Sequence, residues 1–144
     1  MTAKEYLSRI QRSRYMMEKH AERIEELYHV ATGLKAIVYD ADRVQTSPEN
    51  QMENVFAMID AEAHKYAKAR IRYEKEVRKR MDQIGKLDNV LYIKVLTLRY
   101  IDGLRWEEIA CQIGYSFRHV TRIHGEALAA FTAMYKDVLL CPRQ

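Results

Sequence analysis

Arg118, Thr121 and Arg122 combine the residue types and the spacing that recognition of DNA bases requires. Steps of three and four positions place residues on one face of an α-helix. From such a face an arginine can donate two hydrogen bonds to a guanine, and a threonine can contact a thymine methyl group or a base edge. The pattern predicts a DNA-reading helix, although the outer face of any three-helix bundle is also polar.

The residues around this face indicate two short helices joined by a tight turn, within the segment Leu98–Ala127. The apolar residues of the first helix fall on one side: Trp106, Ile109, Ala110 and Ile113. Gly114 can adopt the left-handed conformation that the turn needs, and Ser116 is a good N-cap for the second helix. The inward-pointing residues of the second helix are predicted to be Val120, Ile123 and Ala127. This is the pattern of a helix-turn-helix, which sets its second helix into the major groove.

A further helix is expected before this motif, at about residues 89–102, with Asp88 as its cap and Gly103 as its end. Apolar residues surround it almost completely: Val90, Leu91, Tyr92, Ile93, Val95, Leu96, Leu98 and Ile101. A helix of this kind is buried on more than one side. We expect the helix-turn-helix on one side and the N-terminal helices, or a second subunit, on the other. Residues 129–140 are expected to pack back on the same domain.

A long helix is predicted at the N-terminus. Thr2 and Glu5 form a capping box at its start, and Gly33 is expected to end it. Apolar residues recur seven positions apart and others flank them: Ile10, Met17, Ile24 and Ala31, with Leu7, Ala21, Leu27 and Tyr28. This narrow stripe is typical of a coiled-coil seam or a helical hairpin.

A loop over Leu34–Thr46 is expected to lead to a second long helix, which Ser47 caps and Pro48 begins. Its apolar residues follow mostly three and four positions apart: Met52, Phe56, Ile59, Ala63, Tyr66, Tyr73, Val77, Met81 and Ile84. The two helices most simply form an antiparallel hairpin. The predicted fold is therefore all-α, with a coiled-coil-like hairpin over residues 1–86, for oligomerisation or partner binding, and a helix-turn-helix domain over residues 87–144.

The second long helix carries a basic stretch over Lys65–Arg80. Its cations are Lys65, Lys68, Arg70, Arg72, Lys75, Arg78, Lys79 and Arg80. One interpretation is a solvated helix face whose long side chains cover the seam, and the other is a stripe that contacts DNA phosphates. These charges are spread around the helix, so they cannot all face one duplex.

Composition limits the classes of protein to which this chain can belong. The 144 residues carry a net charge of +4, which permits nucleic acid as a partner without requiring it. Cys111 and Cys141 are far apart, so neither a disulfide framework nor a zinc site is expected. The apolar runs are too short for a membrane span, and Met1–Ile10 lacks a signal-peptide core. We expect a soluble cytoplasmic protein that does not interact with membranes.

No catalytic, metal or cofactor site is expected. The five histidines show no metal-ligand spacing, and each is interpreted as a surface or seam residue. Glu107 and Glu108 could suggest acid–base chemistry, but they open a helix and stabilise its dipole there. The sequence has no glycine-rich phosphate loop and no nucleophile motif, so an enzyme is not predicted.

The segment RYIDGLRWEEIACQIGYSFRHVTRIHGEAL, residues 99–128, resembles region 4 of the sigma-70 factors. It is still more similar to the sigma-region-4-like domains of small phage regulators, the ArpU and RinA-type late transcription activators. Those regulators share motifs that resemble three segments of this chain: the WEEIA sequence, the Gly-Tyr-Ser turn and the VTRIHGEAL helix. Val44–Pro48 also resembles the middle region of these proteins, so the similarity extends loosely over most of the chain.

The resemblance implies roles for individual residues. Phe117, Arg118, Thr121 and Arg122 occupy positions that face base edges in sigma region 4. Arg105 stands where the family usually has Ser or Thr. This departure removes an N-cap, at a cost of about 1 kcal/mol, and places a cation where the domain meets backbone phosphate. The full candidate DNA-binding set adds two neighbours of the reading face and reads Arg105, Ser116, Phe117, Arg118, His119, Thr121 and Arg122. Phe117 replaces a residue that is often charged in sigma factors, so the family's promoter preference does not carry over.

The predicted function is that of a non-enzymatic, sequence-specific transcriptional regulator encoded by a phage or prophage. Its partners would be double-stranded DNA, a second copy of the chain in a homodimer, and host RNA polymerase. The chain has no counterpart of the promoter-melting region, so it resembles an auxiliary regulator and not a complete sigma factor. One alternative is a phage terminase small subunit, which forms rings of many subunits. Another is a helical adaptor that binds only protein.

Overall fold

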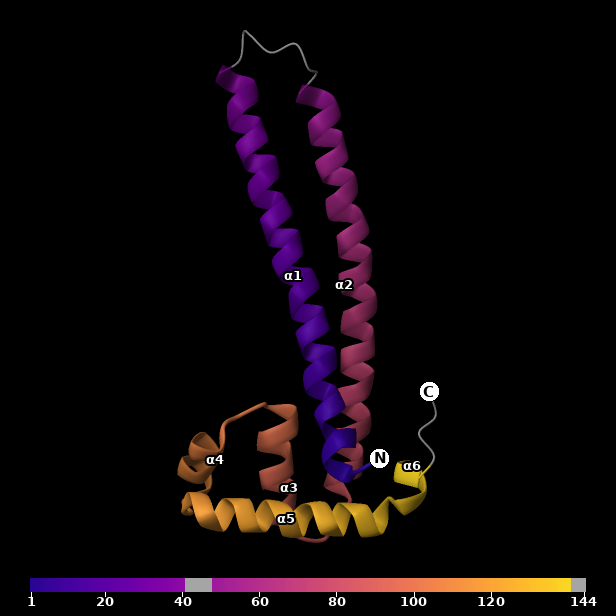
Figure 1. The fold of residues 1–144 in the computed structure, drawn as a ribbon, viewed down its shortest axis with the longest axis vertical. Helices are drawn as coiled ribbons and strands as arrows, with labels where there is room; N and C mark the ends of the chain where they lie inside the picture. Colours follow the sequence, from indigo (N-terminus) through magenta and orange to yellow (C-terminus); the bar gives the residue numbers. More distant parts are fainter. Residues whose placement is uncertain (41–47, 141–144) are drawn as a thin grey trace. The chain divides into compact units, whose positions relative to one another are not determined.

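The computed structural model describes residues 1–40 and 48–140, and the side chains of residues 1–34 and 50–140. The described chain is helical without strands, so the all-α class is confirmed (Figure 1). Its elements are α1 (Ala3–Asp40), α2 (Pro48–Gly85), α3 (Val90–Leu96), the π-helical turn η1 (Thr97–Ile101), α4 (Trp106–Ile113), α5 (Phe117–Met134) and α6 (Lys136–Leu140). None of the helices in this part of the chain is long and apolar enough to cross a bilayer.

The chain divides into two compact units. The first comprises Met1–Ser13 and Tyr73–Gln144, and the second comprises Arg14–Arg72. The first unit thus contains the beginning of α1 and the end of α2 together with all the later helices. The predicted domain boundary, between residues 86 and 87, lies inside this unit.

Both long helices begin as expected, but α1 does not end where predicted. The Thr2 hydroxyl accepts the Glu5 N–H, and the Glu5 carboxylate accepts the Thr2 N–H at 2.8 Å. Pro48 is the first residue of α2. The prediction that Gly33 ends α1 is wrong, because α1 continues to Asp40 and includes residues 34–40 of the expected loop. A single helical glycine costs only about 1 kcal/mol. Residues 41–47, including the predicted cap Ser47, lie outside the described residues.

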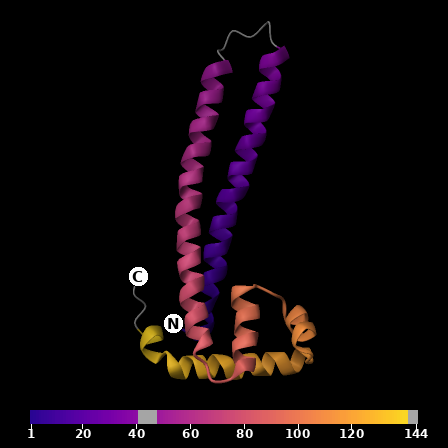
Figure 2. The ribbon, with the colours of Figure 1, turned by 180° about the vertical axis from the view of Figure 1, so that it is seen from behind.

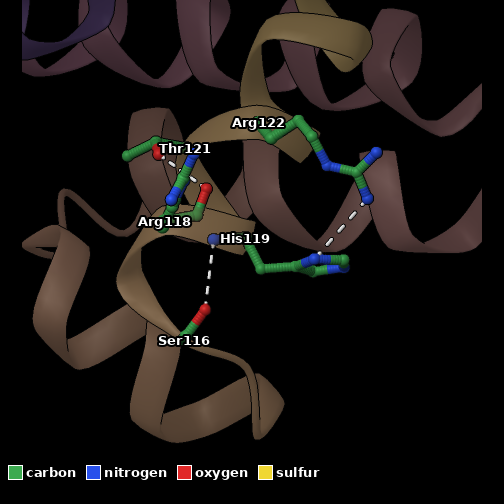
Figure 3. Close-up of a pocket in the computed structure, with 5 residues that line it drawn as sticks. All are labelled: Ser116, Arg118, His119, Thr121 and Arg122. Carbon is green, nitrogen blue, oxygen red and sulfur yellow. Dashed lines mark hydrogen bonds between the residues drawn. The ribbon is translucent and has the colours of Figure 1, made fainter.

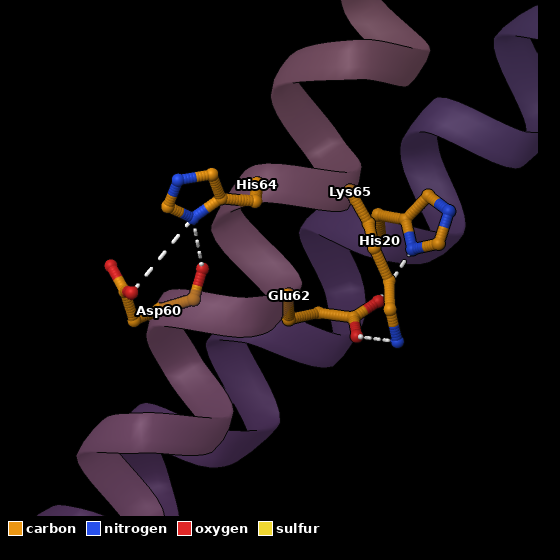
Figure 4. A network of polar contacts seen from close by, with 5 residues as sticks. All are labelled: His20, Asp60, Glu62, His64 and Lys65. Atoms are coloured by element: carbon orange, nitrogen blue, oxygen red, sulfur yellow. Dashed lines mark hydrogen bonds and ion pairs between the residues drawn. The ribbon is translucent and has the colours of Figure 1, made fainter.

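In the second unit α1 and α2 lie side by side, as both views show (Figures 1 and 2). Among the side chains that the structure describes there, the buried apolar residues are Leu27, Ala31 and Ile59. His20 also joins the two helices, since its Nδ1 contacts the Glu62 carboxylate (Figure 4). Two aromatic residues that were expected in or beside the seam are exposed instead, Tyr28 by 54% and Phe56 by 44%. The seam therefore holds fewer large apolar side chains than the spacing predicted.

Two hydrophobic clusters make up the core of the first unit, and α3 with η1 lies between them. The first cluster collects residues from both ends of the chain: Ala3, Tyr6, Leu7, Ile10, Ile84, Leu87, Leu96, Tyr100, Ile101, Ala127, Phe131 and Leu139. The second is built around Val95, Ile109, Val120 and Ile123. Burial of the 89–102 segment on two sides is thus confirmed, and N-terminal residues of the same chain cover one of those sides. Val90 is the exception, since it is 65% exposed.

The caps around this segment differ in part from expectation. Asn89, not Asp88, caps α3, because the Asn89 side chain accepts the Leu91 N–H at 2.9 Å. Gly103, with φ of 75°, follows the π turn. This turn brings the Arg99 guanidinium 4.4 Å from the centre of the Trp106 ring, where it also donates to the Leu104 carbonyl at 2.8 Å.

A buried arginine joins α1 to α2 within the first unit. Arg80 is 2% exposed, pairs with the Glu76 carboxylate, and donates to the Tyr6 carbonyl at 3.2 Å. Its guanidinium lies 4.3 Å from the centre of the Tyr6 ring, and the Tyr6 hydroxyl donates to the Gln83 side chain at 2.9 Å. Arg80 therefore belongs to the core, and neither interpretation of the basic stretch applies to it.

The C-terminal residues pack on the first unit as predicted. Phe131 of α5 and Leu139 of α6 are buried in the first cluster. The Tyr135 hydroxyl donates to the Gln83 carbonyl at 3.0 Å, which joins the end of α5 to the end of α2. Within the expected tail, Met134 is exposed. Packing contacts therefore support α5 along both its N-terminal and its C-terminal half.

Candidate nucleic-acid interface

The turn between α4 and α5 has the geometry that the sequence indicates. Gly114 has φ of 72°, the left-handed region that favours glycine. The Tyr115 N–H donates to the Ala110 carbonyl at 3.1 Å, which closes the C-terminal end of α4. Ser116 caps α5, since its hydroxyl accepts the His119 N–H at 3.3 Å. The direction in which α5 leaves the turn is therefore set by local hydrogen bonds.

At the other end of α4, the Arg105 side chain makes no cap hydrogen bond, as expected for an arginine at this position. The Glu108 carboxylate compensates in part, because it accepts the Arg105 N–H at 2.6 Å. Glu107 and Glu108 both lie in the first turn of α4, where negative charge stabilises the helix dipole. The Arg105 side chain is exposed and forms no ion pair within the described residues.

The first half of α5 has one buried and one open face. The residues that anchor it are Val120, Ile123 and Ala127, all buried. On the opposite side lies an open depression, lined by Ser116, Arg118, His119, Thr121 and Arg122 (Figure 3). The structure thus brings five of the seven predicted site residues together. Phe117, which is 50% exposed, is the first residue of the same helix. Arg105 directly precedes α4 and does not line the depression.

Side chains on this face differ in the hydrogen bonds and ion pairs that they form with other residues of the chain. The Thr121 hydroxyl donates to the Arg118 carbonyl at 2.9 Å, which leaves its methyl group and oxygen lone pairs available (Figure 3). Among the described residues, the Arg118 guanidinium forms no ion pair. Arg118 is therefore an exposed cation at the first turn of α5, with no ion-pair partner in the part of the chain that the structure describes.

Arg122, in contrast, is held by other side chains. Its guanidinium lies 3.3 Å from the Glu126 carboxylate and 3.5 Å from Nδ1 of His119. Glu126 in turn accepts a hydrogen bond from the Tyr92 hydroxyl of α3 at 3.1 Å. This hydrogen bond raises the pKa of Tyr92. Neither Glu126 nor Tyr92 was predicted as part of the site, and Tyr92 was expected only as an apolar residue of the 89–102 helix. The four-residue step from Arg122 could have indicated Glu126, but no local pattern indicates Tyr92.

His124, expected on the flank of α5, is a half-buried residue behind the site. Its Nε2 lies 3.0 Å from the Tyr100 hydroxyl, and its ring meets the Trp106 ring edge-on. Burial, followed by the charges of Arg99 and Lys4, lowers the pKa of His124 to about 4. Burial also raises the pKa of Tyr100 to about 12. His124 is thus neutral near pH 7 and supports the helix from inside.

In the basic stretch of α2, fewer cations are exposed and unpaired than the sequence suggests. In addition to the buried Arg80, Lys65 pairs with Glu62 at 3.2 Å (Figure 4). The hydrogen bonds from His20 and Lys65 to Glu62 lower the pKa of this carboxyl. The other cations that the structure shows as exposed include Lys68, Arg72, Lys75, Arg78 and Lys79.

The described part of the chain contains no group of three or more His, Cys, Asp or Glu residues that could hold a metal ion. Cys111 is an exposed free thiol, and Cys141 lies outside the described residues. Comparisons with protein-family models, with curated proteins and with solved structures found no match.

Proposed function

We propose that this chain is a sequence-specific, DNA-binding transcriptional regulator, and that it reads the major groove with residues 116–125 at the start of α5. In this proposal α1 and α2 form an antiparallel hairpin, and α4, the turn and α5 form a sigma region 4-like helix-turn-helix. The observation that carries the proposal is the open face of α5, where two arginines and a threonine line one depression opposite a buried apolar face.

The charge of this face fits a duplex. The N-terminus of a helix attracts phosphate through its free N–H groups and its dipole. Arg118 lies in the first turn of α5 and Arg122 one turn later, at positions from which a recognition helix contacts base edges. We propose that Arg105, which is exposed just before α4, contacts backbone phosphate, because the first helix of such a motif crosses the backbone.

The second unit supports a role in assembly. Few of its described apolar side chains are buried, while several large ones are exposed: Tyr15, Met16, Tyr28, Val30, Phe56, Met58 and Ile71. Exposed apolar surface on a long helix pair favours packing against another helical surface. We propose a homodimer through this unit, with RNA polymerase as a further partner. A two-fold dimer would bind paired half-sites.

The proposal is tested by selecting bound sequences from a random DNA pool and then measuring affinity for the selected site and for random duplex across a salt series. The variant is Arg118→Ala/Arg122→Ala. Its matched control is Arg9→Ala/Arg12→Ala, which removes two exposed arginines of α1. We expect the site variant to lose preference for the selected site, at about 1–3 kcal/mol for each base-reading arginine. The control should lose no discrimination.

Two outcomes would contradict the proposal. An unchanged affinity ratio in the site variant would show that these arginines do not read bases. A wild-type protein with no affinity for any duplex at low salt would indicate the protein-binding adaptor. Light scattering on the same sample separates a dimer from the multi-subunit ring expected of a terminase small subunit.

A further inference from the structure

A chain of contacts runs from α3 to the open face of α5. The Tyr92 hydroxyl donates to Oε2 of Glu126 at 3.1 Å, and Oε1 of Glu126 lies 3.3 Å from Nη1 of Arg122. Nη2 of Arg122 lies 3.5 Å from Nδ1 of His119, whose ring stacks on Tyr115 with 4.8 Å between centroids. The contacts thus extend from the core to the turn.

We propose that Glu126, held by Tyr92, is a positioning residue that sets the orientation in which Arg122 reads a guanine. This inference rests on the proposed function and deepens it. It assigns Arg122 as the arginine that discriminates between bases, and Arg118 as an adaptable cation that contributes mainly affinity.

The Arg122 side chain is preorganised by its neighbours. An arginine side chain carries about 2 kcal/mol of rotamer entropy, which a free side chain loses when it binds. Two of the five N–H donors of Arg122 are engaged by Glu126 and His119. The remaining donors are available for the bidentate contact with guanine O6 and N7. Arg118 has no ion-pair partner in the described chain, so its orientation is not set in advance.

Tyr92 anchors Glu126 from a packed position. The Tyr92 side chain is partly buried and packs against both hydrophobic clusters of the first unit, which limits its movement. Glu126 stands on α5 between the buried residues Ile123 and Ala127. The carboxylate is therefore supported by two elements, α3 and α5, that the same core holds together.

The Glu126 carboxylate should lower the affinity of the site for DNA. A negative charge beside a phosphate backbone lowers affinity for every sequence. Replacing it with a neutral amide should therefore have two opposite effects. Affinity for random duplex should rise, and preference for the selected site should fall.

The experiment measures affinity for the selected site, for the same site with each G·C pair replaced, and for random duplex. The variants are Tyr92→Phe and Glu126→Gln, each in the wild-type, Arg122→Ala and Arg118→Ala backgrounds. Thermal unfolding checks that every variant is folded. We expect Tyr92→Phe to reduce discrimination at one guanine by roughly three- to tenfold, with random-duplex affinity unchanged. Glu126→Gln should reduce discrimination at the same guanine and raise random-duplex affinity.

The double-variant backgrounds decide between positioning and a general structural role. Tyr92→Phe should cause no further loss in Arg122→Ala, and its full loss in Arg118→Ala. An equal loss in both backgrounds, or a loss spread evenly over all base pairs, overturns the inference. If Arg122→Ala reduces discrimination and Tyr92→Phe does not, only this inference fails. If the wild type has no sequence preference, the proposed function and the inference fail together.

Discussion

His124 presents its ring edge-on to Trp106, with 4.7 Å between the ring centroids, and this contact joins the middle of α5 to the start of α4. The same imidazole lies 3.0 Å from the Tyr100 hydroxyl. The neutral His124 side chain thus packs on the side of the candidate recognition helix that faces away from the depression. The arrangement makes the stability of this unit sensitive to acid.

We expect the unfolding free energy to fall as pH decreases from about 6.5 toward 4. The pKa of His124 is lowered from 6.5 to about 4 in the folded protein. In this window the unfolded state binds the proton and the folded state does not, so acid favours unfolding. Urea titrations at several pH values measure the effect. His124→Gln should show a shallower slope than wild type, while the exposed-site control His64→Gln should not. Equal slopes for wild type and His124→Gln would contradict the assignment.

Two glycine substitutions should change stability in opposite directions. Gly114→Ala places a side chain at φ of 72°, which costs about 1–2 kcal/mol. Gly125→Ala adds a methyl group in the interior of α5, where a new Cβ meets nothing within 4 Å, and should stabilise the helix by about 0.5–1 kcal/mol. Thermal unfolding measures both. Destabilisation by Gly125→Ala would show that this site is more crowded than the structure indicates.

Arg80→Ala should destabilise the first unit by about 3 kcal/mol, because it leaves Glu76 without its partner and the Tyr6 carbonyl without its donor. Arg78→Ala is the matched control, since Arg78 is an exposed arginine two positions away, and it should change stability by no more than about 0.5 kcal/mol. Urea unfolding compares the two variants. Similar values for both would mean that Arg80 is not held in the core.

Arg105→Ser should have two separable effects. It places the preferred N-cap residue before α4, which should raise the unfolding free energy by about 1 kcal/mol. It also removes the exposed cation proposed to contact phosphate, so DNA affinity should fall evenly for all sequences, and the slope of log affinity against log salt should decrease by about 1. Calorimetry and the salt series measure the two effects. A loss confined to one sequence would indicate a base contact instead.

Oligomerisation is tested by Tyr28→Ser/Phe56→Ser, which removes two exposed aromatic side chains of the second unit. We expect the sample to shift from dimer to monomer in sedimentation experiments, with helical content retained. The control is Ile59→Ala, a change at a buried position, which should lower stability by about 2–5 kcal/mol. A double variant that remains dimeric would place the interface elsewhere.

Local sequence determined the helical class, the turn and the face of the candidate site. The three- and four-residue steps of Arg118, Thr121 and Arg122 place them together whatever surrounds the helix. Gly114 and Ser116 specify the turn through backbone conformation and capping, which involve only neighbouring residues. The apolar character of the segment 89–102 likewise predicted its burial on two sides, because a helix apolar all round must be covered.

The tertiary structure decided which of these side chains are free. Arg80 belongs to a basic stretch by composition, yet Tyr6 and Glu76 enclose it in the core. Tyr28 and Phe56 were expected beside and in the seam from their spacing, yet both are exposed. Arg122 differs from Arg118 in its contacts with Glu126 and His119 of its own helix, and the hydrogen bond that holds Glu126 comes from Tyr92 on α3. Periodicity describes one helix at a time, whereas burial and pairing depend on residues that other helices supply.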